Sequence, residues 1–118
     1  MPESLSQADS HDGVRRFLER NPGSSLVAVH EDAIVGAVLG GHDGRRGLIH
    51  HLAVAERARR AGIGKTLLTE CLRRLELAGI DKCHVLVFTS NVAGNEFWRA
   101  SGATERRELS VYSLKTLT

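Results

Sequence analysis

The sequence lacks the long apolar segments that anchor a chain in a membrane or direct it to secretion. None of its hydrophobic runs reaches the ~20 residues that a transmembrane helix needs. The opening segment, MPESLSQADSHDG, is polar and has no hydrophobic core of the kind found in signal peptides. We therefore expect a cytoplasmic protein that does not bind membranes.

Cysteine is scarce, and the charges are nearly balanced. The two cysteines, Cys71 and Cys83, form no CxxC pair, so we expect two buried free thiols and no metal site. The formal net charge is +2, and no block of five like charges occurs. Such a charge distribution gives no support to nucleic-acid binding.

The length and composition suit one small folded unit. The chain has 118 residues, of which 42% are hydrophobic, enough for one modest core. We expect a single domain over residues 1–118, because neither an internal repeat nor a low-complexity segment divides the sequence.

A short helix is predicted near the N-terminus. Val14, Phe17 and Leu18 share one helical face, and the helix is expected to begin after Ser10 or Asp12. The sequence Asn-Pro-Gly at positions 21–23 then ends it.

The next segments read as strands and a loop. Ser25–Val29 and Ala33–Leu39 predict a β-hairpin with a Glu-Asp turn. Gly40–Gly47, GGHDGRRG, is a loop by composition. Near the C-terminus, Thr104–Leu114 shows partial alternation and predicts one long strand or a tight hairpin.

The segment Ala53–Thr66, AVAERARRAGIGKT, joins a strand to a helix. Before it, the apolar run Leu48–Val54 predicts a buried strand. After it, apolar residues at helical spacing continue to Ala78, and Gly79 is expected to cap the helix. The free N–H groups and the dipole of a helix N-terminus favour an anion. The glycines permit close approach and the arginines add charge, so the segment predicts a site for a phosphorylated ligand.

Three phosphate-binding patterns were compared with this segment. The P-loop, GxxxxGK[ST], fails because Arg59 occupies its first glycine position. The dinucleotide pattern GxGxxG fails because Leu67 stands at the third glycine. The pattern [RQ]xxGx[GA] is matched completely by Arg59, Gly62 and Gly64.

At this point the chain resembles the GNAT family of N-acyltransferases, in which this turn binds the pyrophosphate of acetyl-coenzyme A (acetyl-CoA). The neighbouring segments agree with the resemblance. A second apolar strand, Cys83–Thr89, follows the helix. Asn91, the aromatic pair Phe97 and Trp98, and Gly102 then come at the spacing of the family. The match extends from about Leu48 to Ala103.

The resemblance implies an α/β (α+β) fold with flanking helices and a shortened N-terminus. Its sheet would be mixed and mostly antiparallel, with a central parallel pair, Leu48–Val54 and Cys83–Thr89, that splays apart to admit the pantetheine arm of acetyl-CoA. Main-chain groups of Leu52 and Val54 would hold the pantetheine amides. By resemblance, the residues that bind this co-substrate are Leu52, Ala53, Val54, Arg59, Arg60, Ala61, Gly62, Ile63, Gly64, Lys65, Thr66, Asn91, Asn95 and Trp98. For Asn91, an ordinary helix N-cap is an equal alternative.

A base is needed because an alkyl amine of pKa ~10.4 is less than about 0.1% neutral at pH 7. Many relatives use a glutamate near the head of the first central strand, but Leu48 stands at that position. The imidazole of His50 or His51 could replace it. Strand alternation points these two side chains to opposite faces unless a bulge intervenes, and His51 is preferred. A packed or solvent-facing strand histidine is the alternative for each.

An acid for the departing thiolate is not obvious. Relatives commonly place a tyrosine at the second aromatic position after the asparagine, which is Trp98 here. The indole N–H could hydrogen-bond the sulfur or simply pack in the core. Tyr112, the only tyrosine, is a further candidate. Because a thiolate is a tolerable leaving group, a dedicated acid is not obligatory.

The sequence therefore predicts an N-acetyltransferase that moves the acetyl group of acetyl-CoA to a primary amine by direct attack in a ternary complex. The alternatives are a catalytically weak acyl-CoA sensing module of the same fold and a small nucleotide-binding protein. The acceptor is expected to be an amine-bearing small molecule, a protein N-terminus or a lysine. Arg45 and Arg46 could attract an acidic acceptor, although loop arginines are commonly just solvated. A homodimer through the last strand is possible.

Overall fold

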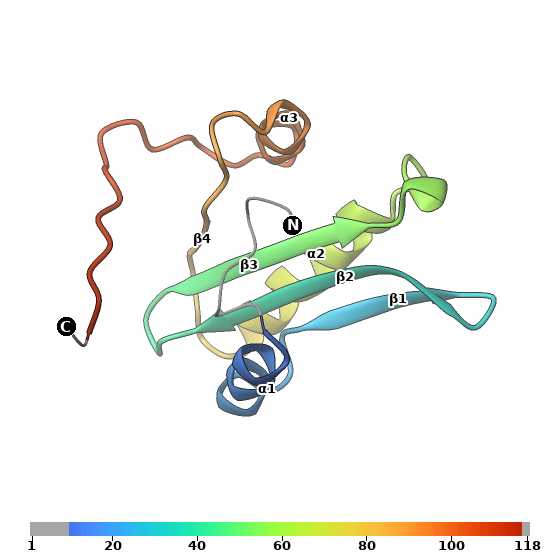
Figure 1. Ribbon diagram of the computed structural model, residues 1–118, viewed down its shortest axis with the longest axis horizontal. Helices are drawn as coiled ribbons and strands as arrows, with labels where there is room; N and C mark the ends of the chain where they lie inside the picture. Colours follow the sequence, from blue (N-terminus) through green and yellow to red (C-terminus); the bar gives the residue numbers. More distant parts are fainter. Residues whose placement is uncertain (1–9, 117–118) are drawn as a thin grey trace. The chain divides into compact units, whose positions relative to one another are not determined.

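The computed structural model describes residues 10–116, which form two compact units, one ending at Phe88 and the other beginning at Thr89 in the sequence. The first unit contains a four-stranded sheet in the order β1-β2-β3-β4 (Figure 1). Its strands are β1 (Leu26–His30), β2 (Ala33–His42), β3 (Gly47–Val54) and β4 (Cys83–Val85). The β1–β2 and β2–β3 pairs are antiparallel and the β3–β4 pair is parallel. The expected mixed, mostly antiparallel sheet with one parallel pair is confirmed.

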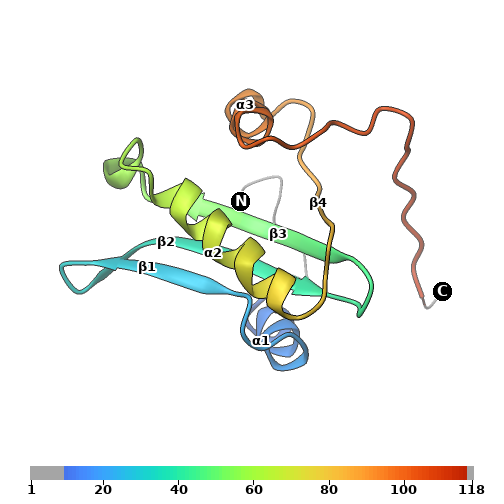
Figure 2. The ribbon, with the colours of Figure 1, turned by 180° about the vertical axis from the view of Figure 1, so that it is seen from behind.

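Two helices lie on opposite faces of this sheet, α1 (His11–Arg20) and α2 (Ile63–Leu77) (Figures 1 and 2). Two adjacent glycines of β2 make the arrangement clear. A β-carbon at Gly40 would lie 2.6 Å from Cys71 Sγ of α2, whereas one at Gly41 would lie 2.7 Å from the Phe17 ring of α1. Successive residues of a strand point to opposite faces, so the two helices cover different sides.

The core lies between the sheet and α2. The buried apolar side chains come from both layers: Val35, Val38, Ile49, Leu67, Leu68, Cys71, Leu75 and Ile80. The helical spacing of the α2 residues explains why this face is buried. Burial raises the pKa of the Cys71 thiol to about 11. Both cysteines are free, as predicted, but only Cys71 is buried, whereas Cys83 is half-buried.

The predicted helix ends are confirmed. The Ser10 side chain caps α1 by accepting a hydrogen bond of 3.2 Å from the N–H of Gly13. Gly79 follows α2 with a φ of 87°, the left-handed conformation that favours glycine.

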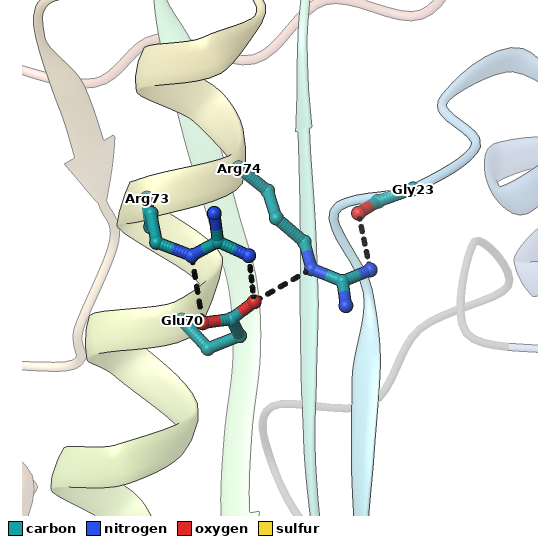
Figure 3. Close-up of polar contacts among 4 residues, drawn as sticks. All are labelled: Gly23, Glu70, Arg73 and Arg74. Carbon is teal, nitrogen blue, oxygen red and sulfur yellow. Dashed lines mark hydrogen bonds and ion pairs between the residues drawn. The ribbon is translucent and has the colours of Figure 1, made fainter.

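Salt bridges within α2 orient Arg74, which hydrogen-bonds the chain before β1 (Figure 3). The Glu70 carboxylate accepts hydrogen bonds from Arg73 Nη2 at 2.6 Å and from Arg74 Nε at 3.1 Å. Arg74 Nη1 also donates to the main-chain oxygen of Gly23 at 3.0 Å. The helix is thereby connected to a segment 51 residues away in sequence.

Two sequence-based expectations were wrong in their extent. Strand β2 continues through Gly40 and Gly41, which had been assigned to a loop, because glycine is needed there for close contact with both helices. Strand β4 ends at Val85 rather than Thr89, since it pairs only with Gly47–Ile49.

The second unit contains α3 (Val92–Ala100) followed by a segment without regular structure. Thr104–Leu114 forms neither the long strand nor the hairpin that was expected. Leu109, Val111 and Leu114 break the two-residue alternation of a strand, and all three are exposed. Four consecutive charged residues, 105–108, precede them.

Candidate functional site

The parallel strands β3 and β4 pair over only three residues. Gly47, Leu48 and Ile49 are opposite Cys83, His84 and Val85. Strand β3 then continues to Val54, whereas β4 has ended at Val85. The edge of β3 beyond Ile49 therefore faces no strand within the part of the chain that the structure describes. This geometry agrees with the expected splay of the central pair.

The main-chain groups of Leu52 and Val54 point toward this open edge. The N–H of Ala55 donates to the oxygen of Val35 on β2 at 2.7 Å. In an antiparallel ladder only alternate residues bond to the partner strand, so Ala53 and Ala55 face β2 while Leu52 and Val54 face away. The contact between Arg59 Nε and the oxygen of Val54, at 3.1 Å, agrees with this direction. The edge thus offers polar main-chain groups for pairing with an extended ligand.

The turn after β3 is short and strained. It comprises the 3-10 helix η2 (Glu56–Ala58), an extended Arg59, and two positions in the left-handed region, Arg60 with φ 71° and Gly62 with φ 79°. Glycine adopts this conformation freely, whereas for arginine it costs about 1 kcal/mol or more. Such strain is common where a backbone must fit a ligand.

Helix α2 begins immediately after this turn with Gly62 as its N-cap, and no side chain among the described residues caps it. The N–H groups of Ile63, Gly64 and Lys65 have no acceptor one helical turn earlier. No acidic residue lies in the first turn. The hydroxyl of Thr66 is used internally, since it donates to the oxygen of Gly62 at 2.9 Å. The N-terminus of α2 can therefore accept an anion from solvent.

The positive side chains around this helix end are accessible. Arg59, Arg60 and Lys65 are exposed, and the Arg59 guanidinium uses its Nε atom to hold Val54. Its two Nη atoms can still donate hydrogen bonds to a phosphate oxygen. Ala61 is exposed beside them. The cofactor-binding residues predicted between Leu52 and Thr66 thus run from the open edge of β3 to the N-terminus of α2.

A β-bulge places His50 and His51 on the same face of the sheet. Leu39 pairs with His51 and Gly40 pairs with Ile49, so His50 is the extra residue. The His50 ring packs edge-on against Phe17 of α1, with the ring centroids 4.9 Å apart. His51 faces the same side because its partner Leu39 precedes Gly40, which faces Cys71 of α2, so Leu39 points to the α1 side. Simple alternation, which predicted opposite faces, is overridden by the bulge.

A hollow of about 310 Å³ lies on this α1 face. It is lined by Phe17, Asn21, Gly41, His42, Asp43, Arg46, Gly47, Leu48, His50 and His84. Of the two candidate bases, only His50 is among these lining residues. His50 also follows Ile49, the last β3 residue paired with β4. The hollow and the open edge of β3 therefore meet at His50.

Sequence reasoning named Arg46 as a possible contact for an acidic acceptor but did not find the hollow to which it belongs. His42, Asp43, Arg46 and His84 come from a strand end, a loop and another strand, and no local pattern indicates that they converge. Leu48 lies beside them, at the position where the sequence lacked the glutamate of relatives.

The remaining predicted site residues belong to the second unit. Asn91 is the N-cap of α3, and its side chain accepts a hydrogen bond of 2.9 Å from the N–H of Gly94. Asn95 Nδ2 donates to the oxygen of Asn91 at 2.8 Å. Trp98 is half-buried and contacts Phe97 edge to face. Tyr112 is 89% exposed in the irregular segment.

No cluster of three or more potential metal-binding side chains occurs within residues 10–116. In that same range, no helix combines the length and apolar character required to cross a bilayer.

Comparison with known proteins points to one family. The family model for the acetyltransferase (GNAT) family matches residues 1–103 of this chain. An acetyltransferase of Pectobacterium atrosepticum is 36% identical over 80 residues, covering 68% of this chain and 57% of the relative. One from Yersinia enterocolitica is 35% identical with the same coverage. The chain thus spans 57% of the length of these relatives.

Solved structures show the same fold. The aminoglycoside 6'-N-acetyltransferase AAC(6')-Ig of Acinetobacter haemolyticus superposes with a TM-score of 0.76 at 16% identity, covering 95% of this chain and 83% of that one. Ard1 of Thermoplasma volcanium gives a TM-score of 0.75 at 24% identity, with coverages of 85% and 68%. AAC(6')-Iy, solved with a bisubstrate analogue of coenzyme A, gives 0.74 at 17% identity, with coverages of 97% and 83%.

Proposed function

The chain belongs to the GNAT acetyltransferase family, and on this premise we propose that it transfers the acetyl group of acetyl-CoA to a primary amine by direct attack. One observation carries the proposal. An open strand edge at Leu52 and Val54 leads through the Arg59-x-x-Gly62-x-Gly64 turn into a helix N-terminus that no described side chain caps. This sequence of features suits a long ligand with an amide-bearing arm and a diphosphate.

The residues of this segment have separate roles in binding acetyl-CoA. The main-chain groups of Leu52 and Val54 pair with the pantetheine amides. The N–H groups of Ile63, Gly64 and Lys65 receive the diphosphate, with Arg59 and Arg60 adding positive charge. The bound molecule supplies an activated thioester. The main-chain oxygen of Val54 already accepts a hydrogen bond from Arg59. The main-chain N–H of Val54 is therefore the group more available to the ligand.

For the general base we propose a histidine next to the point where β3 and β4 separate. We assign this role to His50, which lines the hollow, rather than to His51, which the sequence favoured. A neutral imidazole there takes a proton from the acceptor ammonium, directly or through water. His50 would then hold that proton while the amine reacts.

The roles of the second unit stay as sequence-based proposals. Asn91 and Asn95 would contact the cofactor, and Trp98 would wall the thioester pocket or donate its indole N–H to the sulfur. Tyr112 is the alternative proton donor. Asn91 already acts as a helix cap, so a second role would use its Nδ2 group.

The acceptor and the assembly are also proposals. Solved relatives were crystallised with amine-rich ligands, AAC(6')-Iy with a neamine-based bisubstrate analogue and meta-AAC0020 with sisomicin. An amine-bearing small molecule is therefore our first expectation, ahead of a protein N-terminus or lysine.

Dimerisation was expected through a last strand, but residues 104–114 form no strand. Light scattering is the measurement that tests the oligomeric state. Cell fractionation tests the cytoplasmic location.

The proposal is tested by ligand-induced stabilisation together with thiol release. A ligand at 100 times its Kd adds ~2.7 kcal/mol to the free energy of unfolding, which is measurable as a rise in Tm. We expect a rise with acetyl-CoA and with CoA but none with ATP, and amine-dependent release of the CoA thiol. A rise without release from any amine would favour the sensing module, which Leu48 and Trp98 support. Stabilisation by ATP alone would favour the nucleotide-binding alternative.

A further inference from the structure

The residues that line the hollow on the α1 face limit which acceptor substrates can bind there. Its volume of about 310 Å³ lies at the lower end of the usual range for small-molecule sites. Its apolar wall is formed by Phe17 and Leu48, and its polar wall by three histidines, an arginine, an asparagine and one aspartate. The balance of donors and acceptors in the polar wall determines which ligand fits.

The one carboxylate in the lining is turned toward its own loop. Asp43 Oδ1 accepts hydrogen bonds from the N–H groups of Arg45 at 2.8 Å and Arg46 at 2.9 Å. These backbone donors, that of Arg46 most strongly, hold the pKa of Asp43 below its ordinary value. One oxygen of the carboxylate is therefore engaged by the loop, and this single negative charge is the only one that the lining offers to a polycation.

His42 presents a donor. Its Nδ1 atom accepts a hydrogen bond of 3.0 Å from the N–H of Gly44. In a neutral imidazole the other nitrogen must then carry the proton, so Nε2–H is a donor. Asn21 contributes no spare acceptor of equal strength, because its Oδ1 accepts from the N–H of His42 at 3.0 Å.

Arg46 is only lightly engaged. Its Nη1 atom donates to the oxygen of Arg45 at 3.3 Å and lies 3.8 Å from the carboxylate of Asp81. Asp81 is 89% exposed, and such an exposed pair is weak. The guanidinium can therefore exchange this contact for a bound anion, which it can grip with two parallel hydrogen bonds.

We propose that the hollow receives the acceptor and that the acceptor is an amine carrying a carboxylate or a phosphate. This inference rests on the proposed acetyl transfer. The anionic group lies against Arg46 and the Nε2–H of His42, and the amine points toward His50, where the parallel strands separate. A polyamine or an aminoglycoside fits this lining less well, because its additional ammonium groups would meet a single carboxylate, that of Asp43.

The first test compares amines that differ only in their second group. γ-Aminobutyrate is paired with butylamine and with butane-1,4-diamine, and phosphoethanolamine is paired with ethanolamine. Thiol release from acetyl-CoA gives kcat/KM for each. We expect the anionic member to exceed its partners by at least about tenfold, the effect of one good charge-assisted contact. Comparison of γ-aminobutyrate with phosphoethanolamine shows which anion is preferred.

The second test uses neighbouring arginines as a matched pair. Arg46→Gln should reduce the advantage of the anionic amines about tenfold, because Arg46 lines the hollow. Arg45→Gln should leave the advantage intact, since Arg45 is not among the lining residues. Both variants keep the backbone donors to Asp43.

A third test requires no turnover. Millimolar inorganic phosphate, added to protein saturated with CoA, should shift the ring-proton NMR signals of His42 and His84 in the wild type and in Arg45→Gln, but weakly in Arg46→Gln. Absence of this shift in the wild type overturns the inference, as does equal turnover of charged and uncharged amines. Failure of the proposed function is distinct, because it is seen as no rise in Tm with acetyl-CoA.

Discussion

Arg59 and Val54 are joined by a hydrogen bond of 3.1 Å from the guanidinium Nε to the main-chain oxygen. The bond connects the turn before α2 to the open edge of β3. It holds the arginine through one of its N–H groups and leaves the two Nη atoms able to donate elsewhere, and it relates the two halves of the proposed acetyl-CoA site. We therefore expect this single residue to serve both the local fold and the bound ligand.

Arg59→Lys should therefore weaken CoA binding although the charge is kept. Lysine cannot donate to Val54 and present a planar pair of donors at the same time. We expect Kd for CoA to rise about tenfold, or ~1.4 kcal/mol, by isothermal titration calorimetry. Arg57→Lys in the adjacent 3-10 helix is the control and should change Kd little. Equal losses in both variants would show that only overall charge matters.

Gly64→Ala should move stability and ligand binding in opposite directions. Gly64 is the second residue of α2, where alanine is favoured over glycine by less than the ~1 kcal/mol of a helix interior, so the free protein should melt at a slightly higher temperature. The new methyl group would crowd the proposed diphosphate and reduce the CoA-induced rise in Tm. Gly79→Ala is the reverse control, because its left-handed φ of 87° should lower Tm and leave CoA affinity unchanged. Unaltered CoA binding by Gly64→Ala would contradict the placement.

The two histidines of the bulge should differ in their effect on turnover. His50→Gln is expected to reduce kcat about a hundredfold, within the range for loss of a general base, and to flatten the fall of kcat at acidic pH. His51→Gln should retain most of kcat and keep that fall, because His51 does not line the hollow. The measurement is thiol release as a function of pH with a saturating amine. The opposite ranking would return the role to His51.

The packing of Gly40 against Cys71 gives a test of the fold itself. A β-carbon at Gly40 would lie 2.6 Å from Cys71 Sγ, so Gly40→Ala should cost ~1–3 kcal/mol in free energy of unfolding. Cys71→Ala makes room for the new methyl group, and the double variant should recover ~1 kcal/mol relative to additivity. Urea denaturation of the four proteins measures this coupling. Strict additivity would mean that the strand moves away instead.

How far the sequence predicted the fold depends on whether the signal was local. The α2 helix was predicted because its apolar residues repeat at helical spacing, and the strand before it was predicted because Leu48–Val54 is a bounded apolar run. The end of β2 was not predicted, because adjacent glycines are typical of loops. In the fold, Gly40 and Gly41 belong to the strand, and the lack of a side chain lets them lie close to α2 and α1. Long-range contacts of this kind leave no periodic trace.

The same distinction applies to the site. The turn from Arg59 to Gly64 was found because it is contiguous and its residue types are few. The hollow was not found, because His42, Arg46 and His84 are brought together by strand pairing. The bulge at His50 depends on register with β2, which alternation within one strand cannot reveal.

Acid should expose the contribution of Glu70 to stability. The side-chain hydrogen bonds of Arg73, followed by those of Arg74, lower the pKa of Glu70 from 4.5 to about 2 (Figure 3). A carboxyl with a lowered pKa in the folded state stabilises the protein above its unfolded pKa, and this stabilisation is lost as the pH falls toward the folded value. Glu70→Gln removes the titrating group and keeps much of the shape.

We therefore expect the wild type to exceed Glu70→Gln in Tm above about pH 5, and this difference to shrink steadily between pH 4.5 and pH 2. The measurement is thermal unfolding at fixed ionic strength over that range. Glu76→Gln, on the same helix and without an ion pair within the described residues, is the control and should show no such convergence. Raising the salt concentration should reduce the Glu70 effect, because the pair is partly exposed and is screened. A difference that stays constant with pH would mean that the Glu70 carboxylate contributes through packing rather than through its charge.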